Sequence, residues 1–167
     1  MKIHAYLITI IITSLFIACG TTRSAAEKEE IAANVEKAVK GPAFKFKATY
    51  VFPTGFRSQH LSPYYEVDVS PDTVKVYLPY YGRAYKAPIS PSEGGYRFTS
   101  TDFDYSLEQG NRSGNWLVKI DFNDLDRSVT FNLDVWENET ARLSITDTDR
   151  QSISFQGDFE TKDLEGD

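Results

Sequence analysis

The sequence predicts an all-β fold: an antiparallel meander of about eight strands that forms a sandwich or a partly open barrel, preceded by one N-terminal helix. Aromatic content is the first reason, because 10 Tyr and 11 Phe stand against a single Met, and aromatic rings favour strands. Beyond residue 43, short segments alternate apolar with polar side chains and are separated by turn residues, as half-buried strands are. No shift in composition marks a second domain in this region.

Length, composition and charge limit the possible functions. With 167 residues, of which 41% are hydrophobic and 25% charged, the chain is long enough for one globular domain with a sizeable core. Its formal net charge is -6 at pH 7, and it contains no basic run. Nucleic acid is therefore excluded as a partner, because binding to phosphates requires clustered Lys and Arg.

Residues 1–18 predict a lipoprotein signal peptide. Lys2 supplies the positive start, and residues 6–18 form an almost continuous apolar run that is too short for an ordinary membrane span. The run ends in FIACG at residues 16–20, which resembles a bacterial lipobox and makes Cys19 the lipidated first residue of the mature chain. The alternative is an incidental cysteine after an ordinary signal; as the only cysteine, it has no disulfide partner in the chain.

Lipidation at Cys19 predicts a protein anchored in the cell envelope. A diacylglycerol group with an added acyl chain, typically palmitate, exceeds the two lipid signals that stable anchoring needs. Residues 20–24 lack an acidic run, which favours the periplasmic face, and the outer membrane is the expected membrane.

Residues 19–43 predict a short polar tether followed by a helix. Ser24, with Glu27 three residues later, forms a capping box that marks the start of the helix. Apolar residues then recur at a spacing of four between residues 31 and 39, and a Gly-Pro pair ends the pattern. The expected helix covers residues 25–40.

Residues 44–160 form the predicted β domain. Period-two alternation in its first strand places on one face Phe44, Phe46, Ala48, Tyr50 and Phe52. The clearest hairpin turns at residues 70–73, where Pro71 suits the second position of a type I turn. Closing this turn gives the cross-strand pairs Val69–Val74, Val67–Val76 and Asp68–Lys75.

The C-terminal part predicts further antiparallel strands. Tyr96 and Phe98 begin one strand, and residues 103–107 continue or follow it. The remaining apolar alternation predicts the pairs Phe122–Val129, Ile120–Phe131, Val135–Ala141, Leu133–Leu143 and Ile145–Ile153. Asn138 or Glu139 takes the left-handed conformation in a three-residue turn. Residues 161–167 are an acidic tail.

These segments resemble a known family. The run YYEVDVSPDTVKVYLPYYGRAYKAPISPSEGGYRFTSTDFDY resembles the DUF4251 domain of Bacteroides-type bacteria, and VTFNLDVW and RLSITDTDRQSISFQGDFE are similar to its C-terminal part. The resemblance covers residues 44–160, and its most specific parts are residues 70–74, residues 78–85 and the Gly94-Gly95 turn. It implies a small secreted lipoprotein with a single β domain. The family has no established activity, so the resemblance assigns no catalytic residue.

The best candidate for a binding site is a tyrosine-rich segment. Arg83 is flanked within nine residues by Tyr77, Tyr80, Tyr81 and Tyr85. Tyrosine offers flat apolar area with a hydroxyl, and arginine offers a fork of donors, which together suit sugar rings, acidic groups or a peptide. The alternative is that these rings cover the open end of the β core.

Evidence for catalysis is weaker. Asp102 and Asp104 project to the same face of a strand, where a carboxylate pair could bind calcium weakly, hydrolyse a glycosidic bond or simply face solvent. His60, beside polar loop residues, is expected to be a surface residue, and no zinc, phosphate or nucleophile motif is present. Thr73, in an Asp-Thr-Val sequence, is a candidate for O-glycosylation.

The sequence therefore favours a membrane-tethered β domain that binds a glycan, a small molecule or an envelope protein and catalyses nothing. It implies no cofactor and no metal. Two other functions stay open: a hydrolase that uses the carboxylate pair, and a structural protein that pairs with a partner through an edge strand.

Overall fold

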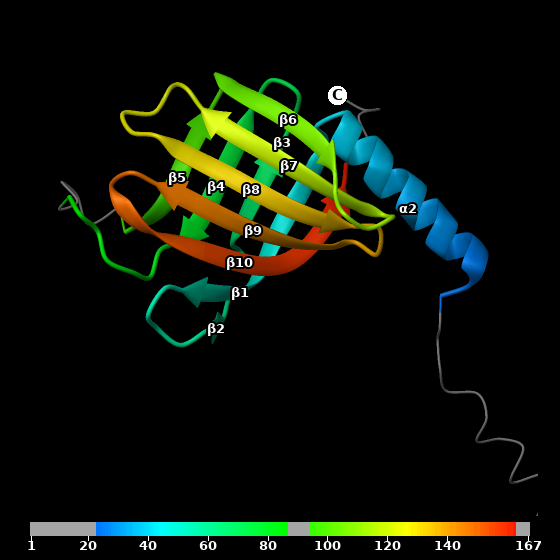
Figure 1. Ribbon diagram of the computed structural model, residues 1–167, viewed down its shortest axis with the longest axis horizontal. Coiled ribbons are helices and arrows are strands. Elements are labelled where there is room, and N and C mark those ends of the chain that lie inside the picture. Colours follow the sequence, from blue (N-terminus) through cyan, green and yellow to red (C-terminus); the bar gives the residue numbers. More distant parts are fainter. Residues whose placement is uncertain (1–22, 87–93, 163–167) are drawn as a thin grey trace, which may run out of the picture.

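The computed structural model describes residues 23–86 and 94–162, and it shows one antiparallel sheet curled into a nearly closed barrel, with a helix at its N-terminal side (Figure 1). The strand order is β5-β4-β3-β1-β10-β9-β8-β7-β6, and β2 pairs with β1 off this path. The elements are α2 (Ala25–Lys40), β1 (Phe44–Pro53), β2 (Gln59–His60), β3 (Glu66–Val69), β4 (Val74–Pro79), β5 (Gly95–Ser100), β6 (Phe103–Gln109), β7 (Asn115–Phe122), β8 (Val129–Trp136), β9 (Thr140–Asp147) and β10 (Arg150–Thr161). The expected all-β class is confirmed. The signal peptide, Cys19 and most of the acidic tail lie outside the described residues.

Helix α2 has the bounds that the capping box and the Gly-Pro pair predict. The Ser24 hydroxyl accepts a hydrogen bond from the Glu27 backbone amide, and the Glu27 carboxylate accepts one from the Ser24 amide. The buried residues Val35, Ala38 and Val39 pack the C-terminal half of α2 over one end of the barrel, while its N-terminal half extends beyond the sheet (Figure 1). Among the described residues, no helix has the length and apolar character needed to cross a lipid bilayer.

Most of the predicted strand registers are confirmed. Val67 lies opposite Val76 in the β3–β4 hairpin, and Asp68 lies opposite Lys75. The C-terminal pairs are also as expected, with Ile120–Phe131, Leu133–Leu143 and Ile145–Ile153 in register. Glu139 has a φ of 66° and is the left-handed residue of the β8–β9 turn. Residues 103–109 form a separate strand that follows β5 rather than continuing it.

Strand β1 departs from the predicted alternation. Ala48 pairs with Gly157 but Tyr50 pairs with Gln156, so Thr49 is the extra residue of a β-bulge. A bulge shifts the phase of alternation by one, and beyond it Tyr50 is 45% exposed and Phe52 37% exposed, whereas Val51 is buried. The expectation that Tyr50 and Phe52 face the core with Phe44 is therefore wrong.

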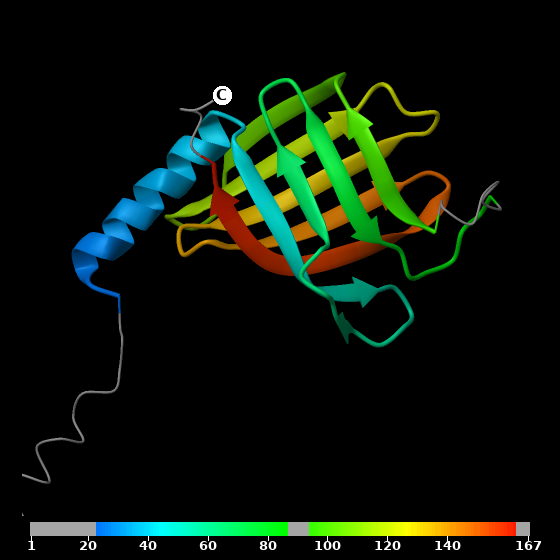
Figure 2. The same ribbon diagram turned by 180° about the vertical axis from the view of Figure 1, so that it is seen from behind.

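The inside of the barrel is filled by side chains. Strands β6–β9 form one wall, and β1, β3, β4 and β5 form the other (Figure 2). Aromatic rings meet between the walls, with centroid distances of 5.0 Å for Phe98–Phe122 and 6.3 Å for Tyr96–Phe131. Within the β6–β9 wall, the rings of Phe122 and Phe131 lie 4.9 Å apart. Because these rings pack edge to face across the barrel, candidate binding surfaces lie on its outer faces.

Candidate functional site

Part of the tyrosine-rich segment closes the barrel at the end away from α2. The Tyr80 hydroxyl donates to the carbonyl oxygens of Arg83 and Gln151, at 2.8 and 3.0 Å. The amide of Gln151 donates to the Arg83 carbonyl, and that of Tyr85 donates to Asp149. These bonds tie residues 80–85 to the β9–β10 turn, so Tyr80 has a structural role.

The five residues of this predicted site are not gathered into one cluster. Tyr77 lies on the outer face of β4, whereas Tyr81, Arg83 and Tyr85 are exposed on the connection after β4. Within the described residues, no ring contact or side-chain hydrogen bond joins Tyr77 to the other four. The arginine that stacks on Tyr77 is Arg97, which the sequence did not single out. A role for the five residues in binding stays a prediction.

The other candidates lie apart from this segment. Asp102 and Asp104 are exposed, and each accepts a hydrogen bond from the Asn123 side-chain amide, at 3.3 and 3.2 Å. His60 contacts the ring of Tyr50 edge-on, with centroids 5.0 Å apart. Thr73 lies in the β3–β4 turn, as the sequence predicts. In the part of the chain that the structure describes, no group of three or more His, Cys, Asp or Glu is placed to hold a metal ion.

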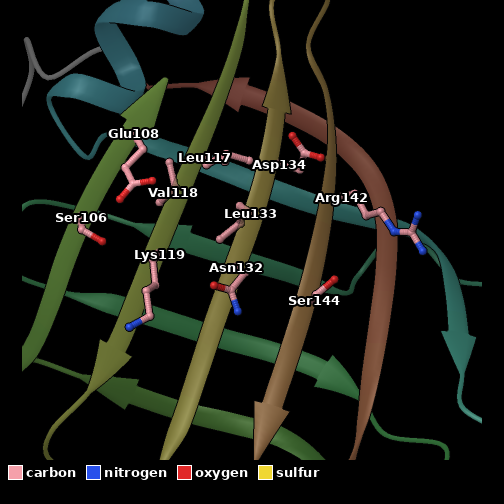
Figure 3. Close-up of a pocket in the computed structure, with 10 residues that line it drawn as sticks. All are labelled: Ser106, Glu108, Leu117, Val118, Lys119, Asn132, Leu133, Asp134, Arg142 and Ser144. Atoms are coloured by element: carbon pink, nitrogen blue, oxygen red, sulfur yellow. The ribbon is translucent and has the colours of Figure 1, made fainter. Parts of the chain in front are cut away.

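A shallow hollow of about 510 Å³ lies on the outer face of β6–β9 (Figure 3). Directly paired residues of antiparallel neighbours point to the same face, so their side chains form rows across the sheet. Two such rows cross this face and continue over β10 to β1. The first row is Ser106, Lys119, Asn132, Ser144, Ser154 and Phe52; the second is Glu108, Leu117, Asp134, Arg142, Gln156 and Tyr50.

Three charged groups of this face are fixed by neighbours. The Lys119 ammonium lies 2.6 Å from the Asp121 carboxylate, which also accepts a hydrogen bond from the Thr130 hydroxyl at 2.6 Å. The hydrogen bonds from Lys119 and Thr130 hold the pKa of Asp121 below its usual range. Asp134 accepts a hydrogen bond of 2.6 Å from the Asn115 side chain. The sides of the hollow are thus preorganised.

The middle of the first row, by contrast, offers unused hydrogen-bonding groups. The side chains of Ser106, Asn132 and Ser144 make no hydrogen bond with other described residues. Each hydroxyl can donate and accept, and the amide has two donors and an acceptor. A ligand with several hydroxyl groups could satisfy all three side chains at once.

Aromatic rings stand at the β1 end of both rows. Phe52 and Tyr50 follow Ser154 and Gln156 in register, and the bulge at Thr49 is what turns them outward. The guanidinium carbon of Arg142 lies 5.8 Å from the centre of the Phe52 ring. The polar hollow therefore passes into an exposed apolar wall without a break in the sheet.

The apolar alternation of the sequence marks the inward-facing residues of each strand, so it does not point to this outer surface. The signal was nevertheless present in the predicted registers. Pairing Ile120 with Phe131 and Leu133 with Leu143 also places Lys119, Asn132 and Ser144 side by side on the opposite face. Phe52 could not be added, because nothing in the sequence marks the bulge.

Comparisons with known proteins agree with this architecture. The family model described as a domain of unknown function, DUF4251, matches residues 26–159. A crystal structure of a DUF4251 family protein from Bacteroides eggerthii is similar, with a TM-score of 0.58 and 14% identity. The match covers 79% of this chain and 88% of that chain. No curated protein matches the sequence.

Proposed function

Because the chain belongs to the DUF4251 family, for which no function is established, we propose its function from its own surface: a lipid-anchored envelope protein whose β domain binds a glycan. The proposed site is the outer face of β6–β9, together with the aromatic wall on β1. Binding rather than catalysis is proposed, since the hollow is shallow and open and the barrel interior is filled.

One observation carries this proposal: unused polar side chains lie in register beside exposed aromatic rings. A sugar presents hydroxyl groups around its edge and C–H groups on its faces, so it needs hydrogen-bonding partners and apolar area together. Asn132, Ser144 and Ser106 supply the first, and Phe52 and Tyr50 supply the second. The rows are several strands wide, which suits an extended oligosaccharide better than a single small molecule.

Binding is tested with a panel of neutral oligosaccharides: maltotetraose, cellotetraose, xylotetraose and chitotetraose. We expect saturation-transfer NMR to detect at least one of them, and calorimetry to show that Asn132→Ala weakens its binding by about 5- to 10-fold, the loss of one hydrogen bond. Phe52→Ala should weaken it to a similar degree. Thr99→Ala, an exposed change on the opposite wall, is the control and should leave binding unchanged. Equal affinity in all variants would overturn the proposed site.

The proposed location rests on the apolar leader and on Cys19, whose lipid would hold the chain near the bilayer while residues 20–24 serve as a tether. We expect Cys19→Ala to move the protein from the membrane fraction to the soluble fraction. Retention in the membrane fraction would contradict lipid anchoring. Either outcome leaves the glycan site open to its own test.

The rival functions have less support. Asp102 and Asp104 are exposed, and both accept hydrogen bonds from the side-chain amide of Asn123. This arrangement is typical of carboxylates that stabilise a turn rather than of a catalytic pair in a glycoside hydrolase. Assembly through an edge is favoured by one observation: among the strands of the described residues, β5 and β6 lie at the two ends of the strand path, and each pairs on one side only. Concentration-dependent oligomers in sedimentation that disappear on placing a proline in β6 would support assembly.

A further inference from the structure

We propose that the opposite wall of the barrel carries a second site, which binds the carboxylate of an acidic sugar through Arg97, Lys75 and the rings of Tyr65 and Tyr77. This site lies on the outer face of β3–β5 (Figure 2) and is separate from the neutral-glycan site proposed above. It does not depend on that proposal.

The geometry starts from the strand registers. Tyr77 pairs with Glu66 on one side and with Arg97 on the other, so all three project from the same face. The Arg97 guanidinium carbon lies 4.7 Å from the centre of the Tyr77 ring, in a cation–π contact. The Tyr65 ring lies 5.3 Å from that of Tyr77, inclined by 31°. The arginine fork is therefore held in a defined position by rings.

Two small hollows flank this stack. One, of about 260 Å³, is lined by Tyr65, Tyr77, Arg97 and the Gly94-Gly95 turn. The other, of about 210 Å³, lies on the Lys75 side of Tyr77. Both are below the roughly 300 Å³ at which pockets for drug-sized ligands begin, so each suits one ring or one anionic group of a longer chain.

The charges around the stack favour an anion. Within the described residues, the side chains of Arg97 and Lys75 make no hydrogen bond or ion pair. The nearby acids are already neutralised: Lys45 lies 3.2 Å from both Glu66 and Asp68, and Lys162 also pairs with Asp68. Two unmatched cations thus remain on one side of a chain whose formal net charge is -6.

Arg97 and Lys75 would bind an anion in different ways. A guanidinium binds a carboxylate through two parallel hydrogen bonds, whereas an ammonium acts as a point charge. With Tyr65 and Tyr77 beside the fork, the arrangement matches a carboxylate attached to a sugar ring, as in a uronic acid. A free inorganic anion would use the charges but not the rings.

The test uses tetragalacturonate, maltotetraose and inorganic phosphate in calorimetry at about 50 mM salt, where surface charges are only partly screened. We expect tetragalacturonate to bind, Arg97→Ala to weaken it at least about 10-fold, and Arg97→Lys to give an intermediate loss. Arg142→Ala, on the neutral-glycan face, should leave tetragalacturonate binding unchanged, which separates the two sites. Because Arg97 is exposed, thermal melts should show all variants folded.

Three results would overturn the inference: no binding of tetragalacturonate, binding that Arg97→Ala leaves intact, or displacement by phosphate at an equal concentration. The last result would show an anion site with no preference for sugars. Weakening by Arg142→Ala alone would assign the acidic glycan to the other wall.

Discussion

Tyr96, which is buried, and Tyr105, which is partly buried, should respond in opposite ways to loss of the hydroxyl group. Tyr96, in β5, is fully buried, and its hydroxyl has no hydrogen-bond partner among the described residues. Burial, with the Asp147 carboxylate adding to it, raises the pKa of Tyr96, so the phenol stays neutral over the ordinary pH range. A buried hydroxyl without a partner costs about 1–3 kcal/mol in lost hydration. Tyr96→Phe removes that cost and leaves the ring contacts with Tyr80 and Phe131 in place.

We therefore expect Tyr96→Phe to raise the free energy of unfolding by about 1 kcal/mol, or the melting temperature by about 3 °C. Tyr105→Phe is the matched control. The Tyr105 hydroxyl donates a 2.6 Å hydrogen bond to the Val39 carbonyl near the end of α2, and its loss should lower the free energy by about 1–2 kcal/mol.

Urea unfolding followed by circular dichroism measures the free energy of unfolding of both variants under the same conditions. A loss of stability in Tyr96→Phe as large as that in Tyr105→Phe would refute this prediction, because the Tyr96 hydroxyl would then be making a favourable bond.

Three further predictions concern stability and use the same unfolding assay. Phe131→Ala should lower the free energy of unfolding by about 3–5 kcal/mol because the ring is fully buried, whereas the exposed Phe56→Ala should change it by less than about 0.5 kcal/mol; similar values would contradict a packed interior. Asp68→Asn should lower the free energy of unfolding by about 1–2 kcal/mol at neutral pH. Burial alone would raise the pKa of Asp68, but hydrogen bonds from Lys162 and Lys45 hold this pKa below the ordinary 3.8. The carboxylate therefore stabilises the fold above pH 3.8, and the difference between Asp68→Asn and wild type should shrink as the pH falls below that value; a constant difference would exclude a charge effect. Gly157→Ala should lower the free energy of unfolding by about 2–3 kcal/mol, because the added methyl group would lie 1.9 Å from the Lys47 carbonyl oxygen. An unchanged free energy would mean that the backbone of the β1 bulge shifts to accommodate the methyl group.

The fold followed from the sequence wherever short turns set the register. The β3–β4 hairpin and the β7–β10 meander have connections of a few residues, so the alternation of apolar side chains leaves one pairing that buries them all. Helix α2 was equally well marked, because the capping box and the Gly-Pro pair bound it on both sides.

Features that depend on distant contacts could not be predicted in this way. The bulge at Thr49 forms where β1 crosses the bare backbone of Gly157, more than a hundred residues later. The stacking of Arg97 on Tyr77 depends on the register across a long connection whose length does not fix it. The bulge exposes Phe52 in the first proposed site, and the stacked Arg97 belongs to the second. Because neither feature is visible in the sequence, the sequence favoured the segment around Arg83 as the binding site.

The most direct test of the proposed glycan site is chemical-shift mapping by NMR, with the panel oligosaccharides titrated into the labelled domain. We expect the shifts to cluster on Lys119, Asn132 and Ser144, to include the Asn132 side-chain amide, and to extend to Phe52. Shifts confined to residues 80–85, or spread through the buried core, would contradict it.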